Sequence, residues 1–238
     1  MYLLDSFDRI CIINLPERRD RRRKAERELA SLGLCADGHR IRFVDGIRPP
    51  EAGNFPSVGA RGCYLSHLAV LRQARDDGVG TVLVLEDDVQ FDARLAQPQP
   101  AMSATLLACE WDFAYAGHIE PERGAAAGWL ATQRPLECAH CYAVSARALG
   151  PLVDYLEACL RRPPGHPQGG AMHVDGAISM FRANHPELIT LIATPSLARQ
   201  RGSRSDIAGI RWYDRGPLRN VASLARAVRD QLRRRVHA

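Results

Sequence analysis

The segment TVLVLEDDV, residues 81–89, constrains the fold of this chain more than any other. A continuous apolar run of this kind is typical of a strand that is covered on both faces of a sheet. The run stops at three consecutive acids, Glu86, Asp87 and Asp88. Adjacent carboxylates repel one another, and burying them without partners would cost several kcal/mol each. We therefore expect a buried strand whose end forms a charged site, and a divalent cation is the simplest group that would neutralise it.

The first ninety residues alternate between strand and helix patterns. Asn14 and the three acids both stand where a predicted strand ends, and ligands of parallel α/β sheets bind beyond the carboxyl ends of the strands. We therefore expect Asn14 and the acids to share one crevice. The predicted elements are strands at 9–14, 39–46 and 81–88, helices at 17–33 and 61–78, and a Pro/Gly-rich loop at 47–60.

The second half of the chain carries weaker patterns. Pro151 either kinks one of its helices or marks a boundary. We expect a single catalytic domain over 1–210 and a basic helical tail over 211–238. The predicted elements are strands at 111–117, 138–145 and 187–193, a loop at 118–136, helices at 146–162, 174–181 and 216–235, a flexible loop at 163–173, and an irregular polar segment at 194–207.

Composition and cysteine usage indicate an ordinary reduced protein. The 238 residues suffice for one substantial domain, and the net charge of +5 is modest. Seven cysteines form no secreted disulfide pattern, the N-terminus is no signal peptide, and no apolar run could span a membrane. We expect a cytoplasmic protein. The Arg-rich C-terminal helix either packs on the domain or rests on the anionic inner face of the cytoplasmic membrane.

Strand geometry separates the three acids. Alternate side chains share a face, so Glu86 and Asp88 should project together while Asp87 points away. Oxygen ligands of this kind suit Mn²⁺ or Mg²⁺. The alternative is an acid cluster that only forms a turn or caps a helix. The sequence holds neither a P-loop nor a strand-bound GxGxxG motif, so nucleotide phosphates would be met by metal and basic side chains.

Six segments together resemble glycosyltransferase family 25. They occur in the family's order over about residues 8–207, and they are CIINLPERRDRR, GARGCYLSHLAVLRQA, VLVLEDDVQF, CYAVSARALGPL, VDGAIS and QRGSRSDI. The resemblance implies a GT-A type nucleotide-sugar fold, with a mainly parallel central sheet flanked by helices. It also implies inverting transfer from a UDP-sugar, usually with Mn²⁺. The expected donor sugar is galactose, and the expected acceptor is a saccharide of a surface glycolipid such as lipooligosaccharide.

The resemblance also assigns residues. The alternative role of His67 is that of a packed structural histidine. The alternative for Arg18, and likewise for Arg21, is a solvated arginine on the surface of the helix. Gln200, Ser205 and Asp206 are expected in a lid over the diphosphate. The expected metal ligands are Glu86 and Asp88 of the acidic motif, and His173, two residues before Asp175, is expected to complete the metal shell. The implied donor-binding residues are Asn14, Leu15, Arg18, Arg21, Ser66, His67, Asp87, Gln200, Ser205 and Asp206.

Asp175 is the predicted catalytic base. Inverting transfer needs a group that takes the proton of the acceptor hydroxyl, and Asp175 lies in the VDGAIS segment after a flexible loop. The alternative is that Asp175 only caps the following helix.

Three other functions are weighed against the transferase. A metal-dependent phosphoester hydrolase would use the same acids to activate water. A degenerate relative would bind the nucleotide sugar without transferring it. A nucleic-acid-binding module is disfavoured, because the basic residues lie on two separate helices with few aromatic neighbours. The single CxxC at 138–141 indicates buried thiols rather than a zinc site.

Overall fold

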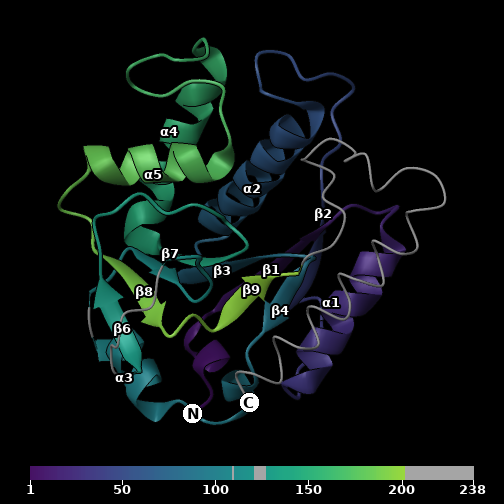
Figure 1. Cartoon of the computed structure of the whole chain (residues 1–238), viewed down its shortest axis with the longest axis vertical. Helices are drawn as coiled ribbons and strands as arrows, with labels where there is room; N and C mark the ends of the chain where they lie inside the picture. Colours follow the sequence, from purple (N-terminus) through teal and green to yellow (C-terminus); the bar gives the residue numbers. More distant parts are fainter. Residues whose placement is uncertain (109, 121–126, 202–238) are drawn as a thin grey trace.

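The computed structural model describes residues 1–108, 110–120 and 127–201. Its centre is a seven-stranded sheet in the order β2-β1-β3-β7-β5-β8-β6, and β4 and β9 form a separate pair (Figure 1). The strands are β1 Arg9–Asn14, β2 Ile41–Asp45, β3 Thr81–Glu86, β4 Val89–Phe91, β5 Phe113–Tyr115, β6 Gly128–Ala131, β7 Cys141–Ser145, β8 Thr190–Thr194 and β9 Ala198–Gln200.

Most strands of the large sheet run in one direction. The pairings β1–β2, β1–β3 and β5–β8 are parallel, whereas β7 is antiparallel to both β3 and β5, and β6 is antiparallel to β8. Five of the seven strands therefore point the same way, and β6 and β7 are reversed. The expected mixed α/β fold with a mainly parallel central sheet is confirmed.

Helices cover both faces of this sheet, with α2, α4 and α5 on one side and α1 and α3 on the other (Figure 1). Each face has its own cluster of buried apolar side chains. This double cover explains why β3 is apolar along its length, since four of its six residues are buried. The helices are α1 Arg19–Ser31, α2 Val58–Asp76, α3 Pro100–Ala108, α4 Ala146–Arg161 and α5 Val174–Asn184, with short 3₁₀ turns at Leu3–Ser6 and Ala93–Ala96.

Local sequence signals determine where helix α2 begins and ends, and one close contact determines how it packs on the loop after β2. The Ser57 side chain accepts a hydrogen bond from the Ala60 backbone at the start of the helix, and Gly78 follows its end with a φ of +66°. Gly62 lies against the loop after β2, where a Cβ would come within 2.5 Å of the Ile47 carbonyl oxygen. The helix can approach this loop only because residue 62 is a glycine.

The first five predicted elements are confirmed, and several later ones are corrected. The predicted loop 118–136 contains β6, a partly exposed edge strand without an apolar pattern. The segment 194–207, expected to be irregular, contains β9. Strand β7 begins three residues later than expected, because Cys138 has a φ of 74°. Helix α4 continues through Pro151, so that proline marks no boundary.

Two expectations cannot be compared with the structure. The helix predicted at 216–235 and the tail 211–238 lie outside the described residues. Within the described ranges, no helix has the length and apolar character needed to cross a membrane.

Candidate functional site

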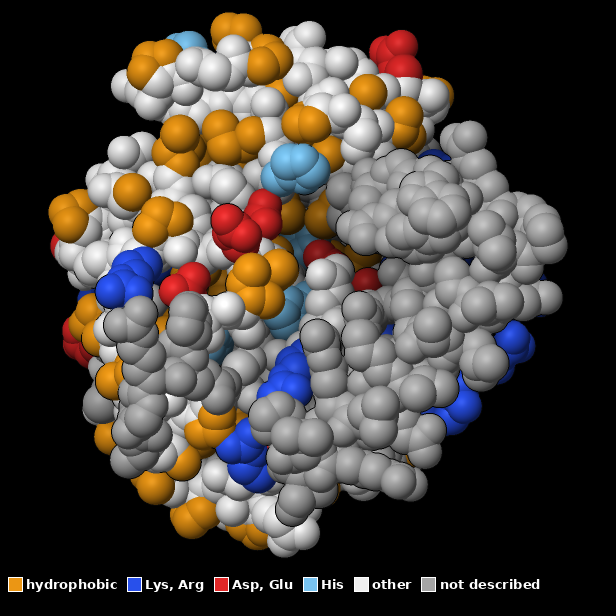
Figure 2. Space-filling model, in the orientation of Figure 1, with side chains coloured by type: hydrophobic (Ala, Val, Ile, Leu, Met, Phe, Trp, Pro, Cys, Tyr) orange, Lys and Arg blue, Asp and Glu red, His pale blue; other side chains and the backbone are white. Residues whose placement is uncertain are grey.

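A cavity of about 190 Å³ lies at the carboxyl edge of β1, β2 and β3. Acidic and histidine side chains gather around a hollow near the middle of the face seen in Figure 2. The residues that line the cavity come from the ends of these strands and the segments that follow them, from α1, from one side of α2, and from β9. They are Ile13, Leu15, Arg21, Gly46, Ile47, Arg48, Val58, Gly59, Gly62, Cys63, Ser66, His67, Glu86, Asp87, Asp88 and Gln200.

Asp87 is held by partners from β1 and α1. Its Oδ1 accepts a hydrogen bond from Arg21 Nη1 at 2.8 Å, and its Oδ2 accepts one from Asn14 Nδ2 at 2.7 Å. Burial raises the pKa of Asp87 above its usual value, and Arg21 and Asn14 oppose this effect. Asn14 and Arg21 thus fix the orientation of one carboxylate. Asn14 contacts the acids through Asp87, but it is not among the residues that line the cavity.

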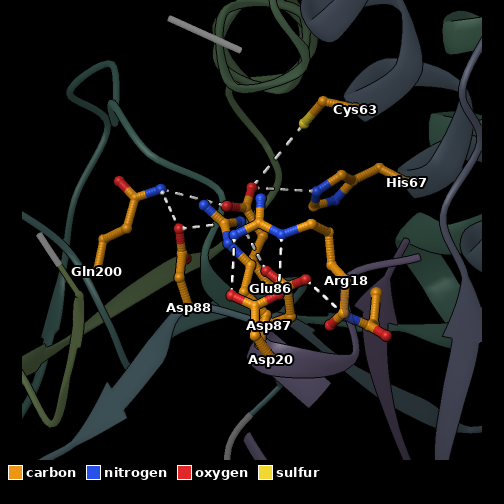
Figure 3. Close-up of polar contacts among 10 residues, drawn as sticks. Arg18, Asp20, Cys63, His67, Glu86, Asp87, Asp88 and Gln200 are labelled. Carbon is orange, nitrogen blue, oxygen red and sulfur yellow. Dashed lines mark hydrogen bonds and ion pairs between the residues drawn. The ribbon is translucent and has the colours of Figure 1, made fainter. Parts of the chain in front are cut away.

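Glu86 and Asp88 share a partner. Gln200 Nε2 donates to Glu86 Oε2 and to Asp88 Oδ2, each at 3.3 Å (Figure 3). Burial, with repulsion from Glu86 and Asp87, raises the pKa of Asp88 to about 7. Asp88 Oδ1 is buried and has no hydrogen-bond partner in the described part of the chain. Two carboxylates facing one shared donor, with an unpartnered buried oxygen, fit the ligand set of a hard divalent cation.

His67 connects the acidic cluster to the core. Its Nδ1 lies 3.0 Å from the Tyr142 hydroxyl, and its Nε2 lies 3.4 Å from Glu86 Oε1. The second pair lacks the geometry of a hydrogen bond, so Nε2 has no such partner among the described residues. The Cys63 thiol lies 3.9 Å from the same carboxylate oxygen. Burial acts to raise the pKa of Glu86, but His67, His140 and Arg21 outweigh it and lower this pKa.

Only some of the other predicted donor-binding residues in the described part of the chain line the cavity. Leu15 lines the cavity. Ser66 also lines it, but its hydroxyl is engaged, because it donates to the Gly62 carbonyl and accepts from the Ile47 backbone. Arg18 forms an ion pair with Asp20. The predicted lid residues Ser205 and Asp206 lie outside the described part of the chain.

Asp175 and His173 lie at the start of α5. The residue at the N-cap position is His173, not Asp175, and His173 is exposed. Asp175 is in the first turn, where its carboxylate accepts from the backbones of Cys138 at 3.0 Å and Gly176 at 2.8 Å. Burial, the charge of Glu86 and, to a smaller extent, the charge of Asp175 raise the pKa of Cys63, which lines the cavity. Neither Asp175 nor His173 is among the residues that line the cavity.

Several residues of this site carry no role predicted from the sequence. Arg48 lines the cavity from the loop after β2 and pairs with Glu17 at 2.7 Å. Tyr142 orients His67 across 75 positions of sequence. Cys63 had a signal, since it lies one helical turn before His67 and therefore on the same face of α2.

The likeness to solved structures is distant. A glycosyltransferase involved in the glycosylation of the major capsid of PBCV-1 matches with a TM-score of 0.42 and 12% identity, over 83% of this chain and 95% of that one.

Comparisons of sequence point to one family. Inactive glycosyltransferase 25 family member 3 of Homo sapiens is 32% identical over 142 residues, which cover 49% of this chain and 23% of that protein. Procollagen galactosyltransferase 1 of Danio rerio is 30% identical over 131 residues, 47% of this chain and 21% of that protein. The chain thus spans less than a quarter of the length of these curated relatives. Residues 7–118, just under half of the chain, match the family model described as glycosyltransferase family 25 (LPS biosynthesis protein).

Proposed function

We propose that this chain is a metal-dependent, inverting glycosyltransferase that moves a sugar from a UDP-sugar to a saccharide acceptor. The observation that supports it most is the Glu86–Asp88 acidic cluster inside a cavity at the carboxyl edge of the sheet, within the segment that matches family 25. Galactose is the proposed donor sugar, because several similar proteins are named procollagen galactosyltransferases. The proposed acceptor is a saccharide of a surface glycolipid such as lipooligosaccharide.

Glu86 and Asp88 are the proposed ligands of Mn²⁺ or Mg²⁺, with His173 as a further candidate. The bound cation would supply positive charge to the donor diphosphate. The cavity of about 190 Å³ is smaller than the roughly 300–1,000 Å³ of typical small-molecule sites. We therefore expect the charged part of the donor to enter it while the rest lies over the rim, where Arg48 is placed.

The chain's own residues have separate proposed roles. Arg21 and Asn14 hold Asp87 in place, and Gln200 holds Glu86 and Asp88 toward one side of the site. Asp175 is the proposed base that takes the proton of the acceptor hydroxyl as the anomeric carbon is attacked.

The first experiment is thermal unfolding with Mn²⁺ and a panel of UDP-, GDP- and CMP-sugars, in wild type and Asp88→Ala. A donor at about 100 times its Kd adds roughly 2.7 kcal/mol, which should raise Tm by about 5–10 °C at this size. We expect a Mn²⁺-dependent shift with one UDP-sugar that is lost in the variant. No shift with any nucleotide sugar would overturn the proposal.

The base is tested with Asp175→Asn. The amide keeps an oxygen that can accept from the Cys138 backbone, but it cannot take a proton. Transfer should fall by roughly 10²–10⁴-fold while the donor-induced Tm shift stays. Near-normal turnover would remove Asp175 from this role.

A second candidate function rests on the relatives. Two of them are named inactive or probably inactive members of family 25. A protein of that kind would show the donor-induced shift but no transfer to any saccharide. Phosphate release without an acceptor would instead indicate a phosphoester hydrolase.

A further inference from the structure

We propose that Cys63, His67 and Glu86 form a binding site for one thiophilic divalent cation, Zn²⁺ or its analogue Co²⁺. The site shares Glu86 with the proposed donor cation site, but its other two ligands are different. Its formation does not depend on whether the chain transfers a sugar.

The three ligand atoms are already close together. The Cys63 sulfur, one ring nitrogen of His67 and a carboxylate oxygen of Glu86 all lie within 4.8 Å of one another. Glu86 Oε1 is 3.9 Å from the sulfur and 3.4 Å from the nitrogen (Figure 3). Tetrahedral zinc, with bonds of about 2.0–2.3 Å, needs ligand separations of roughly 3.3–3.6 Å. Small side-chain movements are therefore enough to close the site.

His67 is oriented as a metal ligand. The side chain is 1% exposed, and Nε2 has no hydrogen-bond partner among the described residues although it faces Glu86. Such an unpaired buried nitrogen is costly unless it finds a partner. The Tyr142 hydroxyl lies 3.0 Å from Nδ1 and can accept a hydrogen bond from Nδ1–H. This arrangement leaves the lone pair on Nε2, as in metal sites whose histidine donates its other N–H to a second group.

The ligand types select a soft cation. Thiolate and imidazole favour zinc over Mg²⁺ or Mn²⁺, which prefer oxygen ligands. All three residues line the cavity, so a cation has a path of entry, and water or a ligand oxygen can fill a fourth position. Binding breaks the S–H bond of Cys63, forms a metal–sulfur bond and releases the proton to solvent. No electron is transferred.

The test uses Co²⁺ as a spectroscopic probe on the reduced full chain. We expect one Co²⁺ per chain, with the near-ultraviolet charge-transfer band of a thiolate ligand and the visible bands of a tetrahedral ion, all removed by added Zn²⁺. Cys63→Ser should lose the charge-transfer band, and Tyr142→Phe should bind roughly 10–100-fold more weakly. Absence of the band in wild type would overturn the proposal.

Two control variants make the assignment specific. Cys35→Ser removes an exposed thiol outside the cavity and should leave the band intact. Asp88→Asn removes a carboxylate that belongs only to the proposed donor cation site and should also leave the band intact. A band that survives Cys63→Ser, or disappears in Asp88→Asn, would contradict the site. Mn²⁺-dependent transfer without the cobalt band would reject this inference alone, and the band without transfer would reject only the proposed function.

Discussion

Asp88 is an acid of the site whose environment disfavours its own charge. Burial and the neighbouring Glu86 and Asp87 raise its pKa to about 7, from an ordinary value of 3.8. The folded protein therefore binds this proton more tightly than the unfolded chain does. Ionisation of Asp88 lowers the free energy of unfolding as pH rises from about 4 to 7, and the loss is complete above 7. A bound cation would reverse this loss.

Asp88→Asn should therefore stabilise the protein in metal-free buffer. We expect the gap in unfolding free energy between variant and wild type to widen from pH 5 to pH 8, up to a few kcal/mol. Tm measured across this range with a chelator present checks the prediction. A gap that stays constant or narrows would contradict it.

Asp92 provides a control, because its ionisation should change the free energy of unfolding in the opposite direction. Burial acts to raise its pKa, but hydrogen bonds from Arg94 outweigh it and the pKa is lowered. The ionised Asp92 thus stabilises the fold above its unfolded pKa, and this stability is lost as pH falls. Asp92→Asn should lower Tm at pH 8, where Asp88→Asn raises it.

At the scale of elements, the contact between α2 and the loop after β2 shapes one wall of the cavity. Gly62 lines the cavity and lies against the Ile47 carbonyl. The neighbouring Ser66 also ties the helix to the Ile47 backbone. The wall therefore depends on a close approach that a Cβ would prevent.

Gly62→Ala should lower Tm, although alanine is usually favoured over glycine inside a helix by about 1 kcal/mol. The added Cβ would meet the Ile47 oxygen at 2.5 Å, so the helix or the loop must move. Gly176→Ala on α5 is the matched control, because its Cβ meets only the Met172 sulfur at 3.7 Å. We expect that control to be neutral or stabilising. Equal effects of the two variants would contradict this account.

The β4–β9 pair depends on a buried carboxylate of α1. Glu28 accepts from the Phe91 backbone at 3.1 Å and pairs with Arg201 at 2.6 Å. The Arg201 backbone in turn donates to the Asp88 carbonyl at 2.7 Å. These contacts hold the neighbouring Gln200 against the acidic cluster.

Glu28→Gln should loosen this pair of strands. We expect a loss of about 1–3 kcal/mol and faster amide hydrogen exchange at residues 198–201. Glu26→Gln is the control on the same helix, since the Glu26 side chain is 47% exposed and pairs only at the surface with Arg22. Unchanged exchange in Glu28→Gln would show that the strands are held by other contacts.

At the scale of the whole molecule, β3 and β7 lie in the interior of a sheet that is covered on both faces. The edge strand β6 is partly exposed. We expect amide hydrogens of β3 and β7 to exchange most slowly and those of β6 much faster, because opening β3 exposes both apolar clusters. Exchange measured residue by residue checks this order, and protection of β6 equal to that of β3 would contradict it.

Local sequence patterns predict the first half of the fold. The strands at 9–14, 39–46 and 81–88 and the two helices between them follow from apolar periodicity and helix-terminal residues, which act between neighbours in the chain. The same reasoning placed Asn14 and the acids at one edge of the sheet, because strands of one direction end on the same side.

The surroundings of those acids depend on contacts between distant parts of the chain. Gln200 reaches Glu86 across 114 positions, and Tyr142 reaches His67 across 75. The reversed strands β6 and β7 and the short pair β4–β9 likewise depend on partners far along the chain. Strands of three to five residues carry too little local pattern to predict which strands they pair with. Their register is set by which distant backbone groups remain to be paired once the apolar faces are buried.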